Sequence, residues 1–155
     1  MNPKSYIGID PGASGAVALL TTDGEALVED YPGDAVAAAD LIRQWRAVHK
    51  IELACLESVH AMPKQGVSSM FKLGQNFGSW QGILAALGIP HVLVRPQAWQ
   101  AGVLSKGDGP DTKTQSLAAA RRRWPDLELT RKKDHGRADA LHLAAHARSV
   151  EGGKA

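Results

Sequence analysis

Three acidic residues end or interrupt apolar segments of the chain, and their positions suggest chemistry. Asp10 ends the run "YIGID", Glu57 ends the run "IELACLE", and Asp139 lies between two alanines in "DHGRADALHLA". A buried carboxylate is costly unless a cationic partner or a divalent metal compensates its charge. Neither Asp10 nor Glu57 has a lysine or arginine among its immediate sequence neighbours, which favours a metal. For each acid taken alone, a solvent-facing position at the end of its element is the alternative.

Carboxylate oxygens are hard ligands, and they select Mg²⁺ or Mn²⁺ rather than zinc or copper. Two such ions about 4 Å apart can activate water on one side of a phosphate and stabilise the leaving 3′ oxygen on the other. Together, Asp10, Glu57 and Asp139 therefore predict a two-ion site for phosphodiester hydrolysis, with Mg²⁺ as the cofactor and Mn²⁺ as its substitute.

A histidine near Asp139 is a candidate fourth residue of this site. His135 lies four residues before Asp139, so the two side chains share one face of a helix. Asp134 is better interpreted as a helix cap or first-turn acid, but it remains the alternative fourth residue. His142 and His146 have the i, i+4 spacing of a zinc pair, yet no second Cys or His set accompanies them, so no zinc site is predicted there.

Charge divides the chain into an acidic and a basic part. Residues 1–94 carry 6 Lys and Arg against 9 Asp and Glu, whereas residues 95–155 carry 12 against 7. The runs "RRR" at 121–123 and "RKK" at 131–133 suit a polyanionic partner. Ordinary solvated faces are the alternative for the charge runs taken alone.

Length and composition indicate one ordinary domain, which we expect over residues 1–150, followed by a flexible tail at 151–155. The single Cys55 lies in an apolar run, so we expect a buried free thiol and no disulfide partner. No apolar run approaches the roughly 20 residues that span a bilayer, and no signal peptide is evident. We therefore expect no membrane association and a cytoplasmic location, in the bacterial host if the gene is viral.

Hydrophobic patterns and turn signals predict a mixed α/β domain. Strands are expected at 6–10, 16–20, 26–30, 51–57 and within 88–96; helices are expected at about 34–49, 69–87, 112–124 and within 131–147, with a short helix within 97–104 and a loop at 58–68. The main elements follow the order βββαβαβαα, which predicts a five-stranded mixed sheet with helices on both faces. If the first and fourth strands are neighbours, Asp10 and Glu57 lie at one edge.

The helix at 69–87 has two distinct faces. Its apolar residues are Leu73, Phe77, Trp80, Leu84 and Leu87, while Gly74, Gly78 and Gly82 form a strip on another face. A glycine inside a helix costs about 1 kcal/mol relative to alanine. The strip therefore predicts close approach by another element, either in this chain or in a second copy.

Four segments, in order along nearly the whole chain, resemble the RuvC-type Holliday junction resolvases, particularly their phage-like branch, within the ribonuclease H superfamily. "IGIDPGASGAVAL" resembles the opening hairpin with the first catalytic acid, and "CLESVHAM" resembles the strand that ends in the catalytic glutamate. "KLGQNFG" resembles the helix that follows, and "DHGRADALHLA" resembles the closing helix with the last acid.

The resemblance implies a ribonuclease H-like fold and a homodimeric, metal-dependent endonuclease that nicks two opposed strands of a four-way DNA junction. The expected products carry 5′-phosphate and 3′-hydroxyl ends. Asp10, Glu57 and Asp139 correspond to the family's acids, with His135 as the fourth residue. The helix after Glu57 is expected to build the dimer interface.

The resemblance also implies DNA contacts, and it has two departures from the family pattern. Lys113 resembles a lysine near the scissile phosphate, and His60 stands where some relatives carry an aromatic wedge, with Met62 and Phe71 nearby. Many relatives have an acid three residues before the last aspartate, where this chain has Gly136. The predicted DNA-binding residues are Lys113, Lys132, Lys133, Arg137, His60, Lys64 and Lys106.

Three other functions remain compatible with this sequence. A ribonuclease acting on RNA–DNA hybrids has the same core and differs in substrate and oligomeric state. A non-catalytic junction-binding protein needs no acids facing phosphates. An actin-like or sugar-kinase-like ATPase shares the "IDxG" type of turn but normally needs two such domains.

Overall fold

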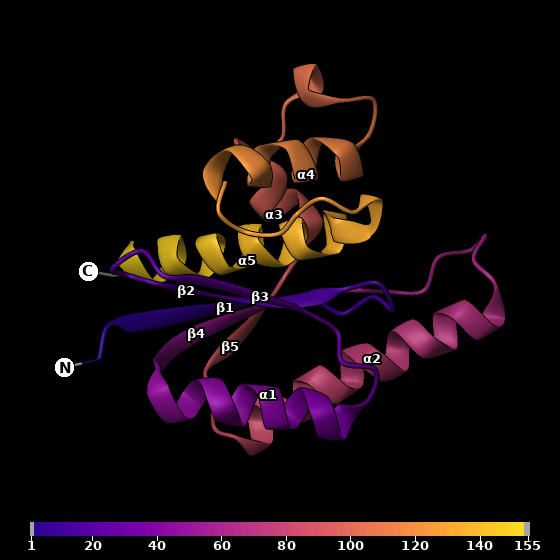
Figure 1. The fold of residues 1–155 in the computed structure, drawn as a ribbon. Helices are drawn as coiled ribbons and strands as arrows, with labels where there is room; N and C mark the ends of the chain where they lie inside the picture. Colours follow the sequence, from indigo (N-terminus) through magenta and orange to yellow (C-terminus); the bar gives the residue numbers. More distant parts are fainter. Residues whose placement is uncertain (1, 154–155) are drawn as a thin grey trace.

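Five strands form one mixed sheet between two layers of helices in a computed structural model, which describes residues 2–153 (Figure 1). The strands are β1 (Lys4–Asp10), β2 (Ala16–Thr21), β3 (Ala26–Asp30), β4 (Lys50–Glu57) and β5 (His91–Val94), and the helices are α1 (Ala35–Val48), α2 (Val67–Ala86), α3 (Pro96–Gln100), α4 (Thr112–Arg123) and α5 (His135–Gly152), with 3₁₀ turns η1 (Lys106–Asp108) and η2 (Lys132–Asp134). The predicted order βββαβαβαα is confirmed, with the short α3 between β5 and α4.

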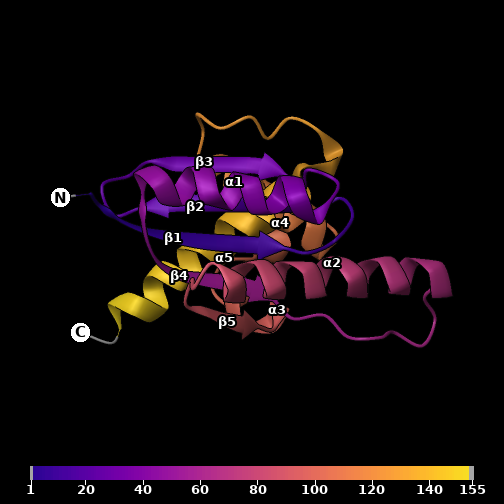
Figure 2. The ribbon, with the colours of Figure 1, turned by 90° about the horizontal axis from the view of Figure 1, so that it is seen from below.

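The order of strands in the sheet is β3-β2-β1-β4-β5. The first three strands are joined as antiparallel neighbours, whereas β1 and β4, and then β4 and β5, run parallel. Parallel neighbours need a crossover connection, and α1 and α2 supply it between β3 and β4 and between β4 and β5 (Figure 2). In the register, Ile9 pairs with Leu56, so the next residues, Asp10 and Glu57, lie at the same edge as predicted.

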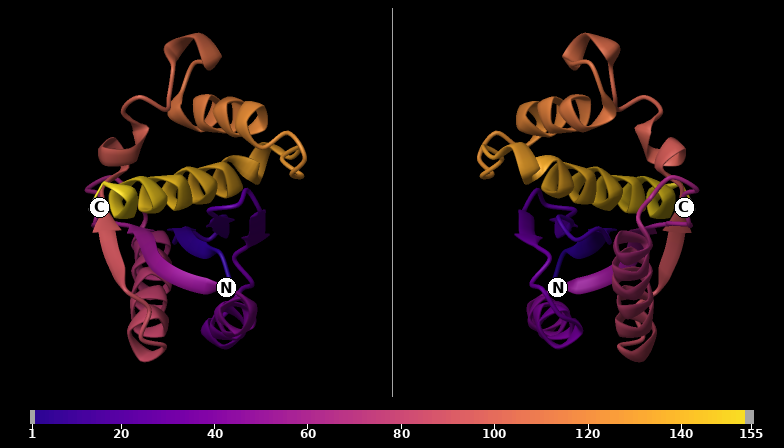
Figure 3. Two further views of the ribbon diagram at one scale, coloured as in Figure 1. Left: turned by 90° about the vertical axis from the view of Figure 1, so that its left-hand side faces the viewer. Right: turned by 90° about the vertical axis from the view of Figure 1, so that its right-hand side faces the viewer.

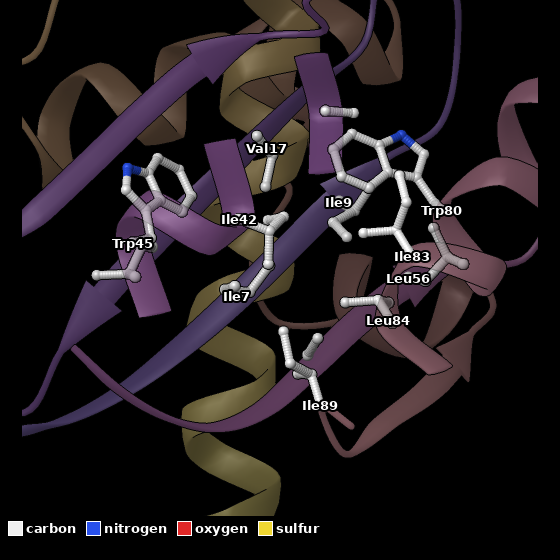
Figure 4. Packing of buried hydrophobic residues seen from close by; sticks show 13 residues of the cluster. Ile7, Ile9, Val17, Ile42, Trp45, Leu56, Trp80, Ile83, Leu84 and Ile89 are labelled. Atoms are coloured by element: carbon white, nitrogen blue, oxygen red, sulfur yellow. The ribbon is translucent and has the colours of Figure 1, made fainter. Parts of the chain in front are cut away.

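One face of the sheet packs on α1 and α2 through a core of large apolar side chains (Figure 4). Ile7, Ile9 and Leu56 from the strands meet Ile42 of α1 and Trp80 of α2, and all five are fully buried. The start of α1 is fixed by its N-cap, because the Asp34 carboxylate accepts a hydrogen bond from the Ala37 amide at 2.8 Å. These contacts fix the crossovers and therefore the order of β1 and β4.

The other face of the sheet is covered by α5, which lies between the sheet and the layer of α3 and α4 (Figure 3). A helix was predicted within 131–147, and its residues from Gly136 to Ala147 are buried on nearly every side. Small alanines let neighbours approach from both directions. On the sheet side, a Cβ at Gly8 would overlap the carbonyl oxygen of Ala140 and the amide of Ala144, so β1 requires glycine at this position.

The apolar face predicted for α2 is confirmed for four of its five residues, since Phe77, Trp80, Leu84 and Leu87 pack in the core beneath the sheet. Leu73, the fifth, is half-buried and lies outside this core. The glycine strip of the same helix, Gly74, Gly78 and Gly82, is different, because a Cβ added at any of the three would point into open space. The close approach that the glycines predict therefore does not come from residues 2–153 of this chain. The first turns of α2 extend beyond the strands and are solvent-exposed (Figure 2).

Two smaller predictions concern the C-terminal residues and Cys55. Helix α5 continues through Gly152, so residues 151 and 152, expected in the tail, are helical; residues 154 and 155 lie outside the described residues. Cys55 is a buried free thiol, as predicted, and burial raises its pKa to about 12. Within residues 2–153, every helix is too short or too polar to cross a membrane.

Candidate active site

Three carboxylates meet where the carboxyl ends of β1 and β4 face the first turns of α5. Burial raises the pKa of Asp10, and burial together with the negative charge of Asp10 raises the pKa of Glu57 to about 7. Burial, and then the charges of Asp10 and Glu57, raise the pKa of Asp139 well above its usual value. The charge of Asp10 thus acts on the pKa of both Glu57 and Asp139, and the charge of Glu57 acts on the pKa of Asp139. The three predicted catalytic acids therefore form one electrostatic cluster.

Each of the three carboxylates has one oxygen held by a hydrogen-bond donor. The amide of Gly12 donates to Asp10 Oδ1 at 3.1 Å, the indole of Trp99 donates to Glu57 Oε2 at 2.7 Å, and the hydroxyl of Ser116 donates to Asp139 Oδ1 at 2.5 Å; in the described part of the chain the second oxygen of each acid has no hydrogen-bond donor. No lysine, arginine or histidine among residues 2–153 forms an ion pair with any of them. Their negative charge therefore has no direct cationic partner there.

This donor set fits a hard divalent cation. The cluster offers carboxylate oxygens with uncompensated charge, which Mg²⁺ and Mn²⁺ prefer. Within residues 2–153, no three Asp, Glu, His or Cys side chains are arranged so that they could hold one metal ion by themselves. An incomplete protein shell is compatible with Mg²⁺, because this ion usually keeps several waters and binds one or two carboxylates.

Glycines bring the first acid and the last acid together. Gly15 donates its amide to the Gly12 carbonyl at 2.9 Å and closes the turn that follows Asp10. A Cβ at Gly15 would overlap the Asp10 carbonyl, and a Cβ at Gly136 would overlap the carbonyl oxygen of Ser14. The turn therefore packs directly on the first turn of α5, and no side chain fits at position 136. This packing explains why the chain lacks an acid at Gly136.

Asp134 and His135 are adjacent in sequence but have different surroundings in the structure. Asp134 is fully buried and paired with Arg131 at 2.6 Å, and it also accepts the Arg131 amide at 2.8 Å. Burial opposes ionisation, but the Arg131 hydrogen bonds hold the pKa of Asp134 below its usual value. Burial and the charge of Lys113 lower the pKa of His135, while Asp10 acts in the opposite direction. Asp134 thus has a structural partner, and His135 lies in the field of Asp10.

A basic cavity of about 670 Å³ adjoins the acids, between α4 and the segment that leads to α5. Among its lining residues are Lys113, Lys132, Lys133 and His135, together with Arg121. The charge of Lys113 lowers the pKa of both Asp10 and Asp139, so its ammonium group acts on the acids through space without pairing with either. Three of the predicted DNA-binding lysines are therefore brought together beside the cluster.

Arg137 does not join these lysines. Its Nε donates to Asp30 Oδ1 at 2.7 Å, its Nη1 donates to the Glu128 carbonyl at 3.2 Å, and its side chain is only 16% exposed. Asp30 also accepts from Arg131 at 2.9 Å. The guanidinium thus ties the end of β3 to α5, and the structure gives Arg137 a structural role where the sequence suggested a phosphate contact.

The remaining predicted DNA contacts lie apart from the basic cavity. His60 lines a second cavity of about 750 Å³ next to Glu57, together with Met62, Arg95 and Gln97 among other residues. Lys64 is exposed in the loop between β4 and α2, and Lys106 is exposed in η1, which projects beyond α4 (Figure 1). Lys106 lines neither cavity.

Sequence reasoning missed several residues of this region. Trp99 and Ser116 hold two of the acids, and Arg95 lines the second cavity. Arg121, which lines the first cavity, belongs to the basic run 121–123 that the sequence had indicated. Arg95 directly follows β5, a strand-end position that could have been grouped with Glu57. No local signal marks Trp99 or Ser116, because their partners are 42 and 23 residues away.

The strand order and the helices on both faces of the sheet define a ribonuclease H-like α/β fold. Among solved structures, it is similar to "T. thermophilus RuvC in complex with Holliday junction substrate", with a TM-score of 0.59 and 16% identity over 91% of this chain and 90% of the other. It is equally similar to a second Thermus thermophilus RuvC structure, at a TM-score of 0.59 and 18% identity over 90% of each chain. The expected RuvC-like fold is therefore confirmed. No family model and no curated protein matches the sequence.

Proposed function

We propose that this protein is a metal-dependent endonuclease that resolves four-way DNA junctions by two symmetrical nicks. The observation that carries the proposal is the cluster of Asp10, Glu57 and Asp139 beside a cavity lined by lysines, in a RuvC-like fold. Acids without cationic partners are costly to a protein that only binds DNA. Their presence favours catalysis over the non-catalytic alternative.

In this proposal the chain's own residues bind the cation and position the phosphate. Asp10, Glu57 and Asp139 would hold one or two Mg²⁺ ions. When bound, such ions would supply Lewis acidity and a water of lowered pKa. The positive charge of Lys113, which lowers the pKa of Asp10 and of Asp139, would neutralise the scissile phosphate, and the partly buried His135 would help to exclude bulk water beside Asp10. Hydrolysis leaves 5′-phosphate and 3′-hydroxyl ends.

The neighbouring lysines give the DNA backbone a path toward the acids. Lys132 and Lys133 lie on the same cavity as Lys113, so they suit consecutive phosphates of one strand. Phosphate contacts position a duplex without reading its sequence. The exposed Phe71 at the start of α2, 73% accessible, and His60 beside Glu57 are suited to contact bases at the junction's centre.

Two nicks in opposed strands require two active sites, which a homodimer supplies. The open strip of Gly74, Gly78 and Gly82 on α2 supports this part of the proposal, because three helical glycines without neighbours cost stability unless another surface packs there. Helices approach one another most closely through such small residues. The strip is therefore the proposed contact between two copies.

A labelled four-way junction tests the proposal directly. The wild-type protein and Glu57→Gln are incubated with the junction, with and without Mg²⁺, and the products are mapped on sequencing gels. We expect paired symmetrical nicks that need metal and disappear in the variant, while junction binding persists. Binding without cleavage under every metal condition would indicate a non-catalytic junction-binding protein, and cleavage of RNA–DNA hybrids alone would indicate a ribonuclease.

A further inference from the structure

Two of the clustered acids are held from the helical layer behind them. Trp99 of α3 is 2% exposed and donates its indole N–H to Glu57, and Ser116 of α4 is equally buried and donates its hydroxyl to Asp139. Each bond fixes one oxygen of its carboxylate. The second oxygen of each carboxylate has no hydrogen-bond donor among the described residues, and Glu57 lines the second cavity.

His142 of α5 connects these two donors. Its Nε2 lies 3.0 Å from the Ser116 carbonyl, and its ring stacks on Trp99 with centroids 5.3 Å apart and planes 17° apart. Trp124 packs against the same imidazole at 5.6 Å. Because a carbonyl can only accept, Nε2 carries the proton, and Nδ1 is an acceptor without a protein partner in the described chain. Among the described residues, His142 forms no hydrogen bond with either acid, whereas it contacts both Trp99 and Ser116.

We propose that Trp99, Ser116 and His142 are positioning residues that orient Glu57 and Asp139 for a divalent cation, an inference that rests on the proposed metal site. Donors behind a ligating carboxylate fix its rotamer, and losing one typically weakens metal binding 10–100-fold. The two donors matter because the acids carry like charges and repel one another when no ion is bound. The hydrogen bonds from Trp99 and Ser116 oppose rotation of the Glu57 and Asp139 carboxylates away from the cluster. His142 keeps the Trp99 ring and the Ser116 backbone in a fixed relation.

A plain packing role makes a different prediction. If these side chains only fill space, their substitution lowers the free energy of unfolding but leaves the cation affinity of the folded protein unchanged. Trp99→Phe separates the two roles when a control variant loses the same volume, since it keeps an aromatic ring for His142 but removes the N–H that reaches Glu57. Trp124→Phe is the matched control, because Trp124 contacts the same imidazole and no carboxylate.

The primary measurement is Mn²⁺ binding without DNA, followed by electron paramagnetic resonance or calorimetry. We expect the Mn²⁺ dissociation constant of Trp99→Phe to rise at least tenfold, while Trp124→Phe binds as the wild type does. Ser116→Ala should weaken binding similarly, and Ser116→Thr, which keeps the hydroxyl, should restore it. Unchanged affinity in both Trp99→Phe and Ser116→Ala would overturn the inference.

His142 is tested by two replacements. Glutamine can keep a donor toward the Ser116 carbonyl, whereas leucine keeps only bulk, so His142→Gln should retain more Mn²⁺ affinity than His142→Leu. Equal affinities for both, at the wild-type value, would remove His142 from the network. If His142→Leu does not fold, His142→Gln compared with the wild type still decides.

Junction cleavage separates this inference from the proposed function. For Trp99→Phe, we expect the Mg²⁺ concentration for half-maximal cleavage to rise about as much as the Mn²⁺ constant, with full activity recovered at saturating metal. A wild-type protein that binds no Mn²⁺ and cuts no junction would refute both proposals. A wild type that binds and cuts, with Trp99→Phe unchanged in both respects, would refute the positioning network alone.

Discussion

Replacing Glu57 with glutamine should stabilise the metal-free protein at neutral pH, although it removes a proposed catalytic residue. Burial and the charge of Asp10 raise the pKa of Glu57 from 4.5 to about 7. An acid whose folded pKa lies above its unfolded pKa destabilises the fold when ionised. Glutamine removes this charge, and its carbonyl can still accept the hydrogen bond from Trp99.

The magnitude follows from the size of the pKa shift. Each unit is worth about 1.4 kcal/mol, so a change from 4.5 to about 7 sets an upper bound of about 3 kcal/mol once Glu57 is ionised. Relaxation of the site reduces this value, and we expect a gain of about 1–3 kcal/mol at pH 7.5. At this chain length, about 1 kcal/mol moves the Tm by about 2–4 °C. The gain should shrink below pH 7 and nearly vanish by about pH 4.5, where Glu57 is protonated in the folded state and half-protonated in the unfolded state.

Thermal and urea unfolding in EDTA measure this gain, and Mg²⁺ provides an internal test. Saturating Mg²⁺ should stabilise the wild type more than Glu57→Gln, because the cation compensates the charge that the variant lacks. Glu29→Gln is the control, since Glu29 is exposed on β3 and should show neither effect. A Glu57→Gln protein that is less stable than the wild type in EDTA at pH 7.5, with Glu29→Gln unchanged, would refute the reasoning.

Three further predictions concern the residues around the site. Asp134→Asn should lower the free energy of unfolding by about 2 kcal/mol at pH 7 in urea titrations, since it breaks the buried pair with Arg131, whose own side chain is 38% exposed. Because the folded pKa of Asp134 is depressed, the difference in stability between variant and wild type should disappear as the pH falls through that folded pKa. A stability difference that stays constant down to pH 2 would contradict this prediction. Gly136→Ala should cost about 2–4 kcal/mol by calorimetry, because its Cβ would overlap the Ser14 carbonyl, and a neutral effect would show that the turn after Asp10 does not pack as described. The double variant Lys113→Ala with Lys133→Ala should reduce the slope of log K for junction binding against log salt by about 2, one per lost phosphate contact, whereas an Arg137→Lys protein that keeps the ion pair should leave the slope unchanged.

The strands, the crossovers and the meeting of Asp10 with Glu57 were predictable because their signals are local. Asp34 caps α1, the apolar runs end at Asp10 and Glu57, and two parallel strands bring those ends together. Each of these features depends on a few neighbouring residues and on general rules of sheet topology. Asp139 has no such local link to the other two acids, and its place beside them was inferred from its residue type and from the family resemblance.

The features that sequence reasoning missed depend on distant partners. Arg137 pairs with Asp30 across 107 residues, and neither residue carries a sign of the other. The burial of α5 on both sides reflects α4 above it, which an alanine-rich pattern does not reveal. The open glycine strip on α2 is likewise a property of the whole surface, so the sequence left open which partner it meets.

The packing of α5 on β1 also determines when the site can exist. Gly8 meets Ala140 across more than 130 residues, and Gly136 meets Ser14 across more than 120. Helix α5 also supplies the core on one whole face of the sheet, so the sheet cannot bury that face until this helix docks. Because a domain generally folds as a unit during synthesis, Asp139 joins Asp10 and Glu57 in the same step that completes the domain.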